Sequence, residues 1–211
     1  MFAASEVLMI NFCSLQSSEP YGSNCYLLES SGEYAIIDPS ARYKDALKLF
    51  PELEGNLKYV LLTHTHFDHM LTINEWVNDG CKVCVGADDA KGLSDAGLNC
   101  YLGFLGIDNG YYGEYTPLSD NDVLQLGDEK IQVISTPGHT PGGVCYKISD
   151  KVFCGDTVFA KGGYGRCDLP GGDISKLEKS LIRLITHIDD AVFYPGHGES
   201  TTLQELIYYF M

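Results

Sequence analysis

Four short apolar segments of this chain each run into a histidine or an aspartate, and this feature constrains the fold more than any other. Their β-branched and aromatic residues predict buried strands at Tyr59–Leu62, Ile131–Ser135, Val152–Cys154 and Val192–Tyr194. Side chains that follow the ends of such strands gather at one sheet edge when the strands pack together. The sequence therefore predicts packed β-strands with a polar edge that can bind metal.

The first strand end is the richest, because the segment after Leu62 reads Thr-His-Thr-His-Phe-Asp-His. His64 and His66 are two residues apart, and such residues project to the same side of an extended chain. Asp68 and His69 are predicted to begin a helix, which turns their side chains back toward the same strand end. Packing alone does not explain four groups that can bind metal within residues 64–69, at the end of a buried strand. We therefore interpret them as metal ligands.

Three more candidate ligands follow later strands, and each comes directly after a glycine: His139, Asp156 and His197. Glycine lets the backbone approach closely to whatever the neighbouring side chain holds. His187 lacks this setting, and near the acidic end of a predicted helix we interpret it as a capping charge.

The remaining pattern predicts two sheets packed together with helices outside. Further strands are predicted at Val7–Phe12, Cys25–Glu29, Tyr34–Ile37, Lys82–Val85 and Val144–Ile148. Helices are predicted at Tyr43–Phe50, Asp68–Asn78, Asp88–Leu93, Ile174–His187 and Leu203–Phe210. Because the strands come in groups, this order favours a single α+β domain over residues 1–211, a four-layer αββα sandwich. The Gly- and Tyr-rich stretch Asp108–Ser119 is expected to be a loop.

Charge and composition exclude several classes of partner. Fourteen Lys and Arg against twenty-nine Asp and Glu give a formal charge of −15, so no nucleic-acid or anionic-membrane partner is expected. No apolar stretch approaches the roughly 20 residues of a membrane-spanning helix. The first basic residue is Arg42, so the N-terminus lacks the positive region of a secretory signal, and a cytoplasmic protein is expected.

The eight cysteines are not expected to form a disulfide framework, because the chain is long enough to build a full core. Most lie in apolar segments, where a free thiol behaves as a small buried hydrophobe. Cys154 is therefore interpreted as a core thiol and not as a nucleophile. Cys81 and Cys84 have CxxC spacing, but no second pair follows, so a metal or redox role is not favoured.

At this point the residues resemble a known family, the metallo-β-lactamase-fold hydrolases. The resemblance rests on His64-x-His66-x-Asp68-His69 followed by His139, Asp156 and His197, in an order that spans almost the whole chain. Within the family the chain looks most like single-domain relatives of glyoxalase II, the hydroxyacylglutathione hydrolases. The finer similarity lies in Asn24-Cys-Tyr-Leu, Ile36-Ile-Asp38-Pro, Thr136-Pro-Gly-His139-Thr-Pro-Gly, Gly165-Arg166-Cys-Asp168-Leu-Pro-Gly-Gly-Asp173 and Tyr194-Pro-Gly-His197-Gly-Glu-Ser-Thr-Thr.

This resemblance implies a metallo-β-lactamase-like fold and a site for two divalent metal ions, with zinc first and iron or manganese as alternatives. The first metal would be held by His64, His66 and His139, and the second by Asp68, His69 and His197. Asp156 would bridge both metals together with a hydroxide. That hydroxide would attack a small thioester substrate, oriented by Asp68, so Asp68 and Asp156 are the expected catalytic residues.

Substrate contacts are expected on the loop after Asp156, from Lys161, Tyr164 and Arg166. The cations would receive a substrate carboxylate, although Arg166 could instead pair with Asp168 or Asp173. Met70 and Leu71 stand where the family commonly has small residues, and they are expected to reshape the pocket floor. Four tyrosines are candidates for its roof: Tyr101, Tyr111, Tyr112 and Tyr115.

Other chemistries remain open on the same residues. A persulfide dioxygenase shares most of them but uses a single iron, and a lactonase would attack a cyclic ester in the same way. A zinc β-lactamase of the commonest kind would have cysteine at the position of Asp156. A non-catalytic metal-binding domain is the alternative from a different class, although all the ligand positions are intact.

Overall fold

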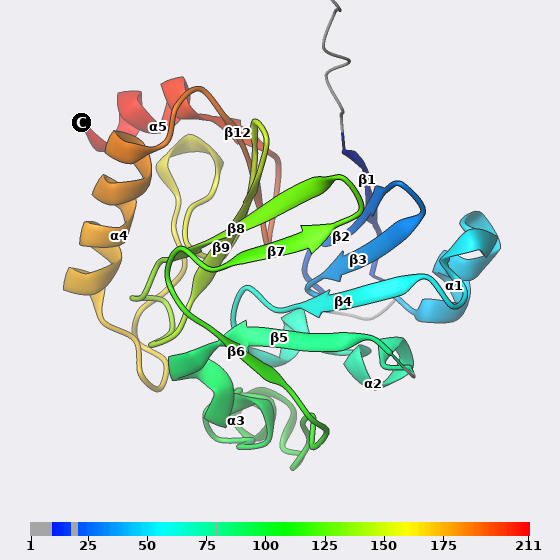
Figure 1. Cartoon of the computed structure of the whole chain (residues 1–211). Coiled ribbons are helices and arrows are strands. Elements are labelled where there is room, and N and C mark those ends of the chain that lie inside the picture. The colour runs from blue at the N-terminus through cyan, green and yellow to red at the C-terminus, as the bar shows by residue number, and fades with distance from the viewer. Residues whose placement is uncertain (1–9, 18–20, 79) are drawn as a thin grey trace, which may run out of the picture.

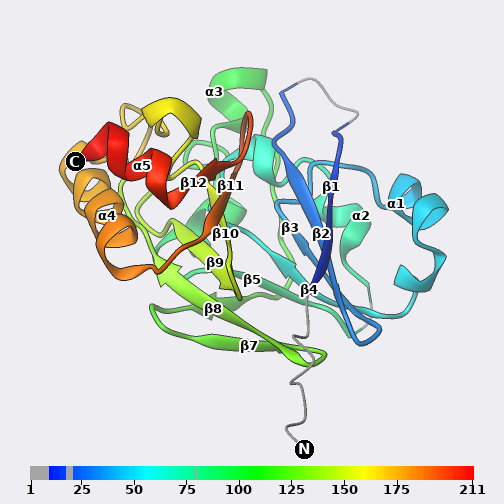
Figure 2. The same ribbon diagram turned by 90° about the horizontal axis from the view of Figure 1, so that it is seen from above.

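A computed structural model of the chain describes residues 10–17, 21–78 and 80–211. It contains two six-stranded sheets, shown in Figures 1 and 2. The first sheet has the order β1 (Asn11–Leu15), β2 (Cys25–Ser30), β3 (Glu33–Ile37), β4 (Leu57–Leu61), β5 (Lys82–Gly86), β6 (Thr116–Leu118). The second has the order β12 (Thr201–Thr202), β11 (Val192–Pro195), β10 (Lys151–Gly155), β9 (Val144–Ile148), β8 (Glu129–Ser135), β7 (Val123–Leu126).

Helices cover the outer face of both sheets. The helices on the first sheet are α1 (Tyr43–Leu49), α2 (Ile73–Trp76) and α3 (Tyr101–Leu105), with the 3-10 turns η1 (Pro51–Leu53), η2 (Phe67–His69) and η3 (Ala87–Leu93). The second sheet carries α4 (Ile174–His187), α5 (Leu203–Phe210) and the turn η4 (Ala160–Gly162). Figure 2 shows α4 and α5 on one side of the sheets and α1 and α2 on the other. The predicted four-layer αββα arrangement is therefore confirmed.

Successive side chains of the central strands point to opposite faces of the sheet, and this alternation explains the layers. In β2 and β3, Tyr26, Leu28 and Ile37 face the second sheet, while Leu27 and Ile36 pack under the helices. Both faces of these strands are buried, which is why their sequence is apolar without interruption. A third apolar cluster joins the second sheet to the buried faces of α4 and α5.

Several predicted elements need correction. The helix predicted over Asp68–Asn78 is instead η2 and α2, because Thr72 interrupts it: its hydroxyl donates to the carbonyls of Pro39 and Ala41 at 2.9 and 2.7 Å. The predicted strand Val7–Phe12 lies partly outside the described residues, and the observed β1 runs on to Leu15.

Short elements were missed by the sequence pattern. The predicted loop Asp108–Ser119 ends in β6, and α3 lies just before it. Strand β7 joins β8 through a tight turn at Gly127, whose φ is +53°, but its four residues are too few for a clear alternation. Among the described residues, no helix has both the length and the apolar character needed to cross a membrane.

Candidate metal centre

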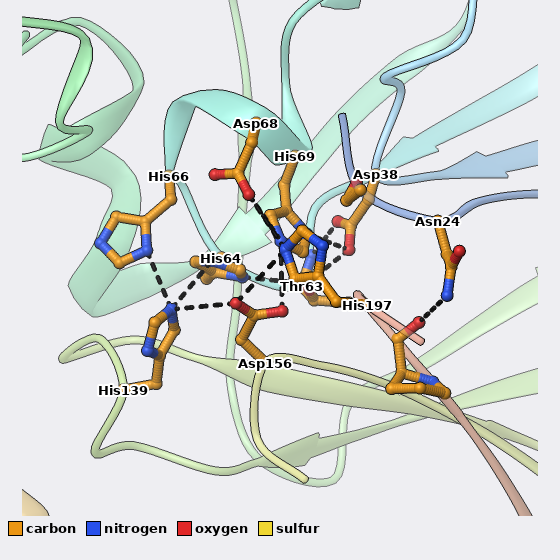
Figure 3. Close-up of polar contacts among 12 residues, drawn as sticks. Asn24, Asp38, Thr63, His64, His66, Asp68, His69, His139, Asp156 and His197 are labelled. Atoms are coloured by element: carbon orange, nitrogen blue, oxygen red, sulfur yellow. Dashed lines mark hydrogen bonds and ion pairs between the residues drawn. The ribbon is translucent and has the colours of Figure 1, made fainter. Parts of the chain in front are cut away.

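The carboxyl ends of β4, β8, β10 and β11 meet at one edge between the two sheets. Strands β3, β4 and β5 run parallel to one another, and so do β10 and β11, so their C-terminal ends point the same way. This edge carries all seven side chains that the sequence singled out, as Figure 3 shows: His64, His66, Asp68, His69, His139, Asp156 and His197.

Three imidazoles converge at one end of the site. His139 Nε2 lies 2.9 Å from His66 Nδ1 and 3.2 Å from His64 Nε2. All three side chains are buried, and their ring nitrogens lie within 4.8 Å of one another. This group supplies three imidazole nitrogens, which are ligands of the kind that zinc prefers.

A second group lies beside the first and contains a carboxylate. Asp68 Oδ2 lies 3.1 Å from His197 Nε2 and 3.6 Å from His69 Nε2. Asp156 stands between the two groups: its Oδ1 is 3.3 Å from His69 Nε2, and its Oδ2 is 3.6 Å from His139 Nε2 and 3.7 Å from His197 Nε2. One carboxylate therefore contacts ligand atoms of both groups.

Hydrogen bonds behind the ligands fix which ring nitrogen carries a proton. His69 Nδ1 donates to Asp38 Oδ2 at 2.8 Å, and His139 Nδ1 donates to the carbonyl oxygen of Arg166 at 2.7 Å. In a neutral imidazole the other nitrogen then has a free lone pair. In both rings that nitrogen is Nε2, which faces the site.

Around the site, acceptor atoms face one another, an arrangement that is unfavourable unless cations lie between them. Buried His69 Nε2 and Asp156 Oδ1 face each other at 3.3 Å, and neither has a hydrogen-bond partner. Buried polar atoms without a partner destabilise a fold unless something compensates them. Divalent cations among these atoms would satisfy them, so the residues fit a metal site.

Burial also sets the charge state of this edge. It lowers the pKa of His64 and, together with the neighbouring His139, lowers the pKa of His66 to about 3. Burial alone would raise the pKa of Asp156, but His69 outweighs it and holds that pKa well below the ordinary range. Burial would lower the pKa of His69, but the carboxylates of Asp156, Asp38 and Asp68 outweigh it and raise that pKa. Metal binds neutral imidazole and ionised carboxylate, so a cation bound at His69 would displace a proton.

Asp38 is a functional residue that sequence reasoning did not assign. It follows β3, is buried, and accepts hydrogen bonds from His69 Nδ1, from the Thr63 amide at 2.8 Å and from the Thr63 hydroxyl at 2.7 Å (Figure 3). Its left-handed backbone, with φ +51°, turns the chain out of the strand. The only signal was the Ile36-Ile-Asp38-Pro motif, noted as a family similarity without a role.

The loop that carries His197 is held by the opposite sheet. The Asn24 side-chain amide donates to the carbonyl of Pro195, a contact drawn in Figure 3, and to that of Gly198, each at 3.0 Å. The Tyr26 hydroxyl donates to the same Pro195 carbonyl at 2.7 Å. The family motif that begins at Asn24 thus positions a ligand from the far side of the site.

Glycines bring the ligand loops close together. A Cβ on Gly196 would stand 2.3 Å from Asp156 Oδ1 and 2.4 Å from His69 Cε1. One on Gly165 would stand 2.2 Å from the Asp156 carbonyl oxygen and 2.7 Å from His139 Nδ1. Any larger residue would push these ligands apart.

A cavity of about 480 Å³ opens onto the ligands, and only one of the predicted substrate contacts lines it. Arg166 does, but both oxygens of Asp168 accept from its guanidinium at 2.6 Å, which is the ion pair considered as the alternative. The Lys161 amide donates to Glu205 on α5, and Tyr164 lies beside Phe210. Neither of these two side chains is among the described residues that line the cavity.

Other expected pocket residues lie elsewhere. Met70 is buried in the core under the first sheet, so it does not reshape the pocket floor. The cavity lining includes none of the four proposed roof tyrosines; Tyr101 and Tyr111 are buried in that core, and Tyr112 and Tyr115 are exposed. Helix α3, which was not predicted, contributes Phe104 to the cavity instead.

The cysteines behave largely as expected. All eight are free, and Cys154 is fully buried in the core beneath α4. Cys84 is buried between the sheets, while Cys81 packs under the helices, so the two thiols lie on different sides of the first sheet. His187 ends α4 in its last turn, consistent with a capping charge.

A four-layer sandwich with a cluster of His and Asp ligands on one strand edge defines a metal-binding protein. The chain belongs to the metallo-beta-lactamase superfamily, whose family profile matches residues 18–197. Most members of this superfamily are hydrolytic enzymes.

Two curated relatives resemble it over most of its length. The probable polyketide biosynthesis zinc-dependent hydrolase PksB of Bacillus subtilis is 32% identical over 82% of this chain and 72% of its own. The hydroxyacylglutathione hydrolase GloC of Haemophilus influenzae is 29% identical over 87% of this chain and 89% of its own.

Solved structures agree with the fold. The BLEG-1 B3 metallo-beta-lactamase superposes with a TM-score of 0.83 at 27% identity, covering 95% of this chain and 97% of its own. The protein TTHA1623, solved in a di-iron-bound form, has a TM-score of 0.77 at 30% identity, covering 93% and 96%. The relatives therefore include zinc and iron proteins.

Proposed function

We propose that this chain is a metallo-hydrolase that cleaves a small thioester, as hydroxyacylglutathione hydrolases do. The observation that carries the proposal is the position of Asp156, whose carboxylate contacts ligand atoms of both groups within 3.7 Å and also lines the cavity. Two bound divalent cations, zinc first and iron or manganese as alternatives, would lower the pKa of a water and polarise the substrate carbonyl.

Asp68 and Asp156 have distinct parts in this site. Burial raises the pKa of Asp68, but His69 and the hydrogen bond from His197 outweigh it, so this pKa lies below its ordinary value. An ionised carboxylate only accepts hydrogen bonds. Since Asp68 lines the cavity, it would hold a proton-donating water in position, while Asp156 keeps the two ligand groups together.

The cavity favours a substrate whose leaving group needs no proton. Apart from five ligand residues, the described residues that line the cavity include no His, Lys, Asp or Glu, and Arg166 keeps its charge. The other proton donors are the Tyr21 phenol, an intrinsically weak acid, and the Cys100 thiol, whose pKa burial raises. An amine must be protonated as it leaves, which calls for a general acid. A thiolate leaves without a proton, so a thioester matches this lining better than an amide does.

The relatives add support of a coarser kind. One bears the name of a hydroxyacylglutathione hydrolase and another that of a zinc-dependent hydrolase. Eight free cysteines suit a reducing compartment, so we place the protein in the cytoplasm. We expect a small molecule as its partner, and neither nucleic acid nor membrane.

A substrate panel tests the proposal. The purified, metal-loaded chain is assayed with S-lactoylglutathione, an uncharged acetyl thioester, a homoserine lactone, a chromogenic cephalosporin and glutathione persulfide with oxygen uptake. The proposal expects thioester turnover well above that of the lactone and the cephalosporin. Oxygen uptake on the persulfide without thioester hydrolysis would contradict it and favour the dioxygenase alternative.

A further inference from the structure

Beyond the ligands, the walls of the cavity are apolar. The side chains that line it there are mainly aromatic or aliphatic, namely Tyr21, Phe67, Cys100, Phe104, Phe159 and Leu169. Among the described residues of the lining there is no Ser, Thr, Asn, Gln or Lys. Ligand cavities of this size hold their ligands mainly through such apolar walls, and a few polar groups orient them.

Two of these aromatic rings stand beside the ligand-bearing segments. The Phe104 ring lies 5.5 Å from that of Phe67, which sits between His66 and Asp68 in the chain, yet 53% of Phe104 is exposed. The Phe159 ring lies 6.2 Å from the His197 ring. The exposed part of the Phe104 ring is thus apolar surface that a ligand in the cavity can cover.

The arginine at this mouth is already paired with a carboxylate. Arg166 is the one cation among the described residues of the lining, and its Nε and Nη2 both donate to Asp168 at 2.6 Å. Both side chains of this pair are more than half exposed, so the pair attracts an external anion weakly. The net charge of −15 also opposes the approach of anions.

From these walls and this paired arginine, we propose that the substrate is a thioester with an uncharged, apolar acyl group that packs against Phe104, Phe159 and Leu169. This inference rests on the proposed thioester hydrolysis. The acyl chain and the sulfur are both bonded to the carbon that is attacked, so both begin inside the cavity, and the acyl chain is the part whose contacts do not depend on which thiol carries it. An acyl group with a carboxylate would lose its hydration against these walls without gaining a free side-chain cation, and it would compete with the reacting carbonyl for the metals.

An acyl series on one uncharged thiol, N-acetylcysteamine, tests the inference with the metal-loaded chain. We expect kcat/KM to rise about fourfold for each methylene from acetyl to butyryl, the increment for burying one methylene. Pentanoyl should exceed succinyl, which has similar length but a carboxylate, by tenfold or more. Phe104→Ala should flatten the series, whereas Leu102→Ala, exposed on the same helix and outside the cavity lining, should leave it unchanged.

A binding measurement separates this inference from the proposed activity. S-alkyl thioethers of the same thiol cannot be hydrolysed, and calorimetry should show tighter binding as the alkyl group lengthens. If the long thioethers bind but no thioester is cleaved, the proposed activity is wrong and the apolar preference stands. If thioesters are cleaved at rates independent of acyl length, or succinyl is preferred, the apolar preference is overturned.

Discussion

The Nδ1 atom of His69 lies 2.8 Å from Oδ2 of Asp38, and both side chains are buried. The aspartate thus holds the ring so that Nε2 faces the metal site. The same carboxylate also accepts from the amide and the hydroxyl of Thr63, so all its acceptors point toward the chain that carries the ligands. Asp38 therefore links the end of β3 to the end of β4.

Asp38→Asn should weaken metal binding about 10- to 100-fold, the usual effect of losing such a supporting contact. The amide turns one acceptor into a donor, and that donor must then face either His69 Nδ1 and the Thr63 hydroxyl or the Thr63 amide, so one of these donors loses its acceptor. Asparagine tolerates the left-handed backbone at this position, so the fold should survive. Competition with a chelator measures the affinity, and far-ultraviolet circular dichroism checks the fold. Unchanged affinity would show that Asp38 does not orient the ligand.

Asp156→Ala should release metal and abolish thioester hydrolysis while the fold persists. The reason is that Asp156 contacts atoms of both ligand groups. Metal content per chain and turnover are measured on the same preparation. Asp150→Ala, in the exposed turn between β9 and β10, is the matched control and should behave like the unchanged chain. If the Asp156 variant hydrolyses substrate normally, its bridging role is wrong.

Asp89 holds the loop that follows His139, so its loss should weaken metal binding by the group that contains His139. This buried carboxylate accepts from the Thr140 hydroxyl at 2.7 Å and from the Gly142 amide at 2.5 Å, on either side of Pro141 and just after His139. Asp89→Ala leaves both donors without a partner, which costs about 1–3 kcal/mol each. We expect a lower melting temperature and loss of metal from the group that contains His139.

The neighbouring Asp88 provides the control for that experiment, because it is exposed on the same turn. Asp88→Ala should leave both the melting temperature and the metal content unchanged. If the Asp89 variant keeps its full metal content and loses only stability, its role is structural and does not extend to His139.

The convergence of the seven candidate ligands could be predicted from sequence because the information is local. Each ligand follows an apolar strand within a few residues, and strand ends on one sheet edge are neighbours in space. The role of Asp38 could not be predicted, because its partners Thr63 and His69 lie more than twenty residues further along the chain. Its importance arises only when β3 and β4 pair.

Of the three predicted substrate contacts, the structure brings only Arg166 to the cavity. Arg166 was chosen for its charge, but its backbone carbonyl is what supports His139, while its side chain pairs with Asp168. Sequence identifies side-chain chemistry and gives no sign of which carbonyl a ring nitrogen meets. The wall residue Phe104 was missed because α3 has only five residues, too few for a helical period.

Asp168→Asn should change substrate preference by releasing Arg166. Without its carboxylate partner, the guanidinium can receive an anionic acyl group, so succinyl thioester turnover should rise several-fold relative to pentanoyl. Kinetics of both substrates on both proteins measure the ratio. An unchanged ratio would mean that the pair does not set the charge at the cavity mouth.

The pH dependence of stability has a predictable contribution from Asp120, whose carboxylate accepts from Arg183 at 2.7 Å and from the Ser135 amide at 2.8 Å. Burial raises the pKa of Asp120, but the contact with Arg183 outweighs it and places this pKa below its ordinary value. A group whose pKa is lowered in the native state stabilises the fold above about pH 4. This stabilisation is lost as the pH falls through the lowered pKa.

Asp120→Asn should therefore lower the free energy of unfolding at pH 7 by up to about 1 kcal/mol, since the pair is partly exposed. The difference should shrink toward pH 3. Urea unfolding at both pH values measures it, with the exposed Asp190→Asn as control. A difference that is equal at both pH values would contradict the electrostatic origin.

The central claim is that two cations, held by groups that share Asp156, are needed for thioester hydrolysis. The most direct measurement is a titration of the metal-free chain with zinc, in which bound metal and hydrolysis of a butyryl thioester are followed together. The account predicts saturation at two zinc ions per chain, with activity that tracks the second equivalent. Full activity at one equivalent, or binding of two without any hydrolysis, would contradict it.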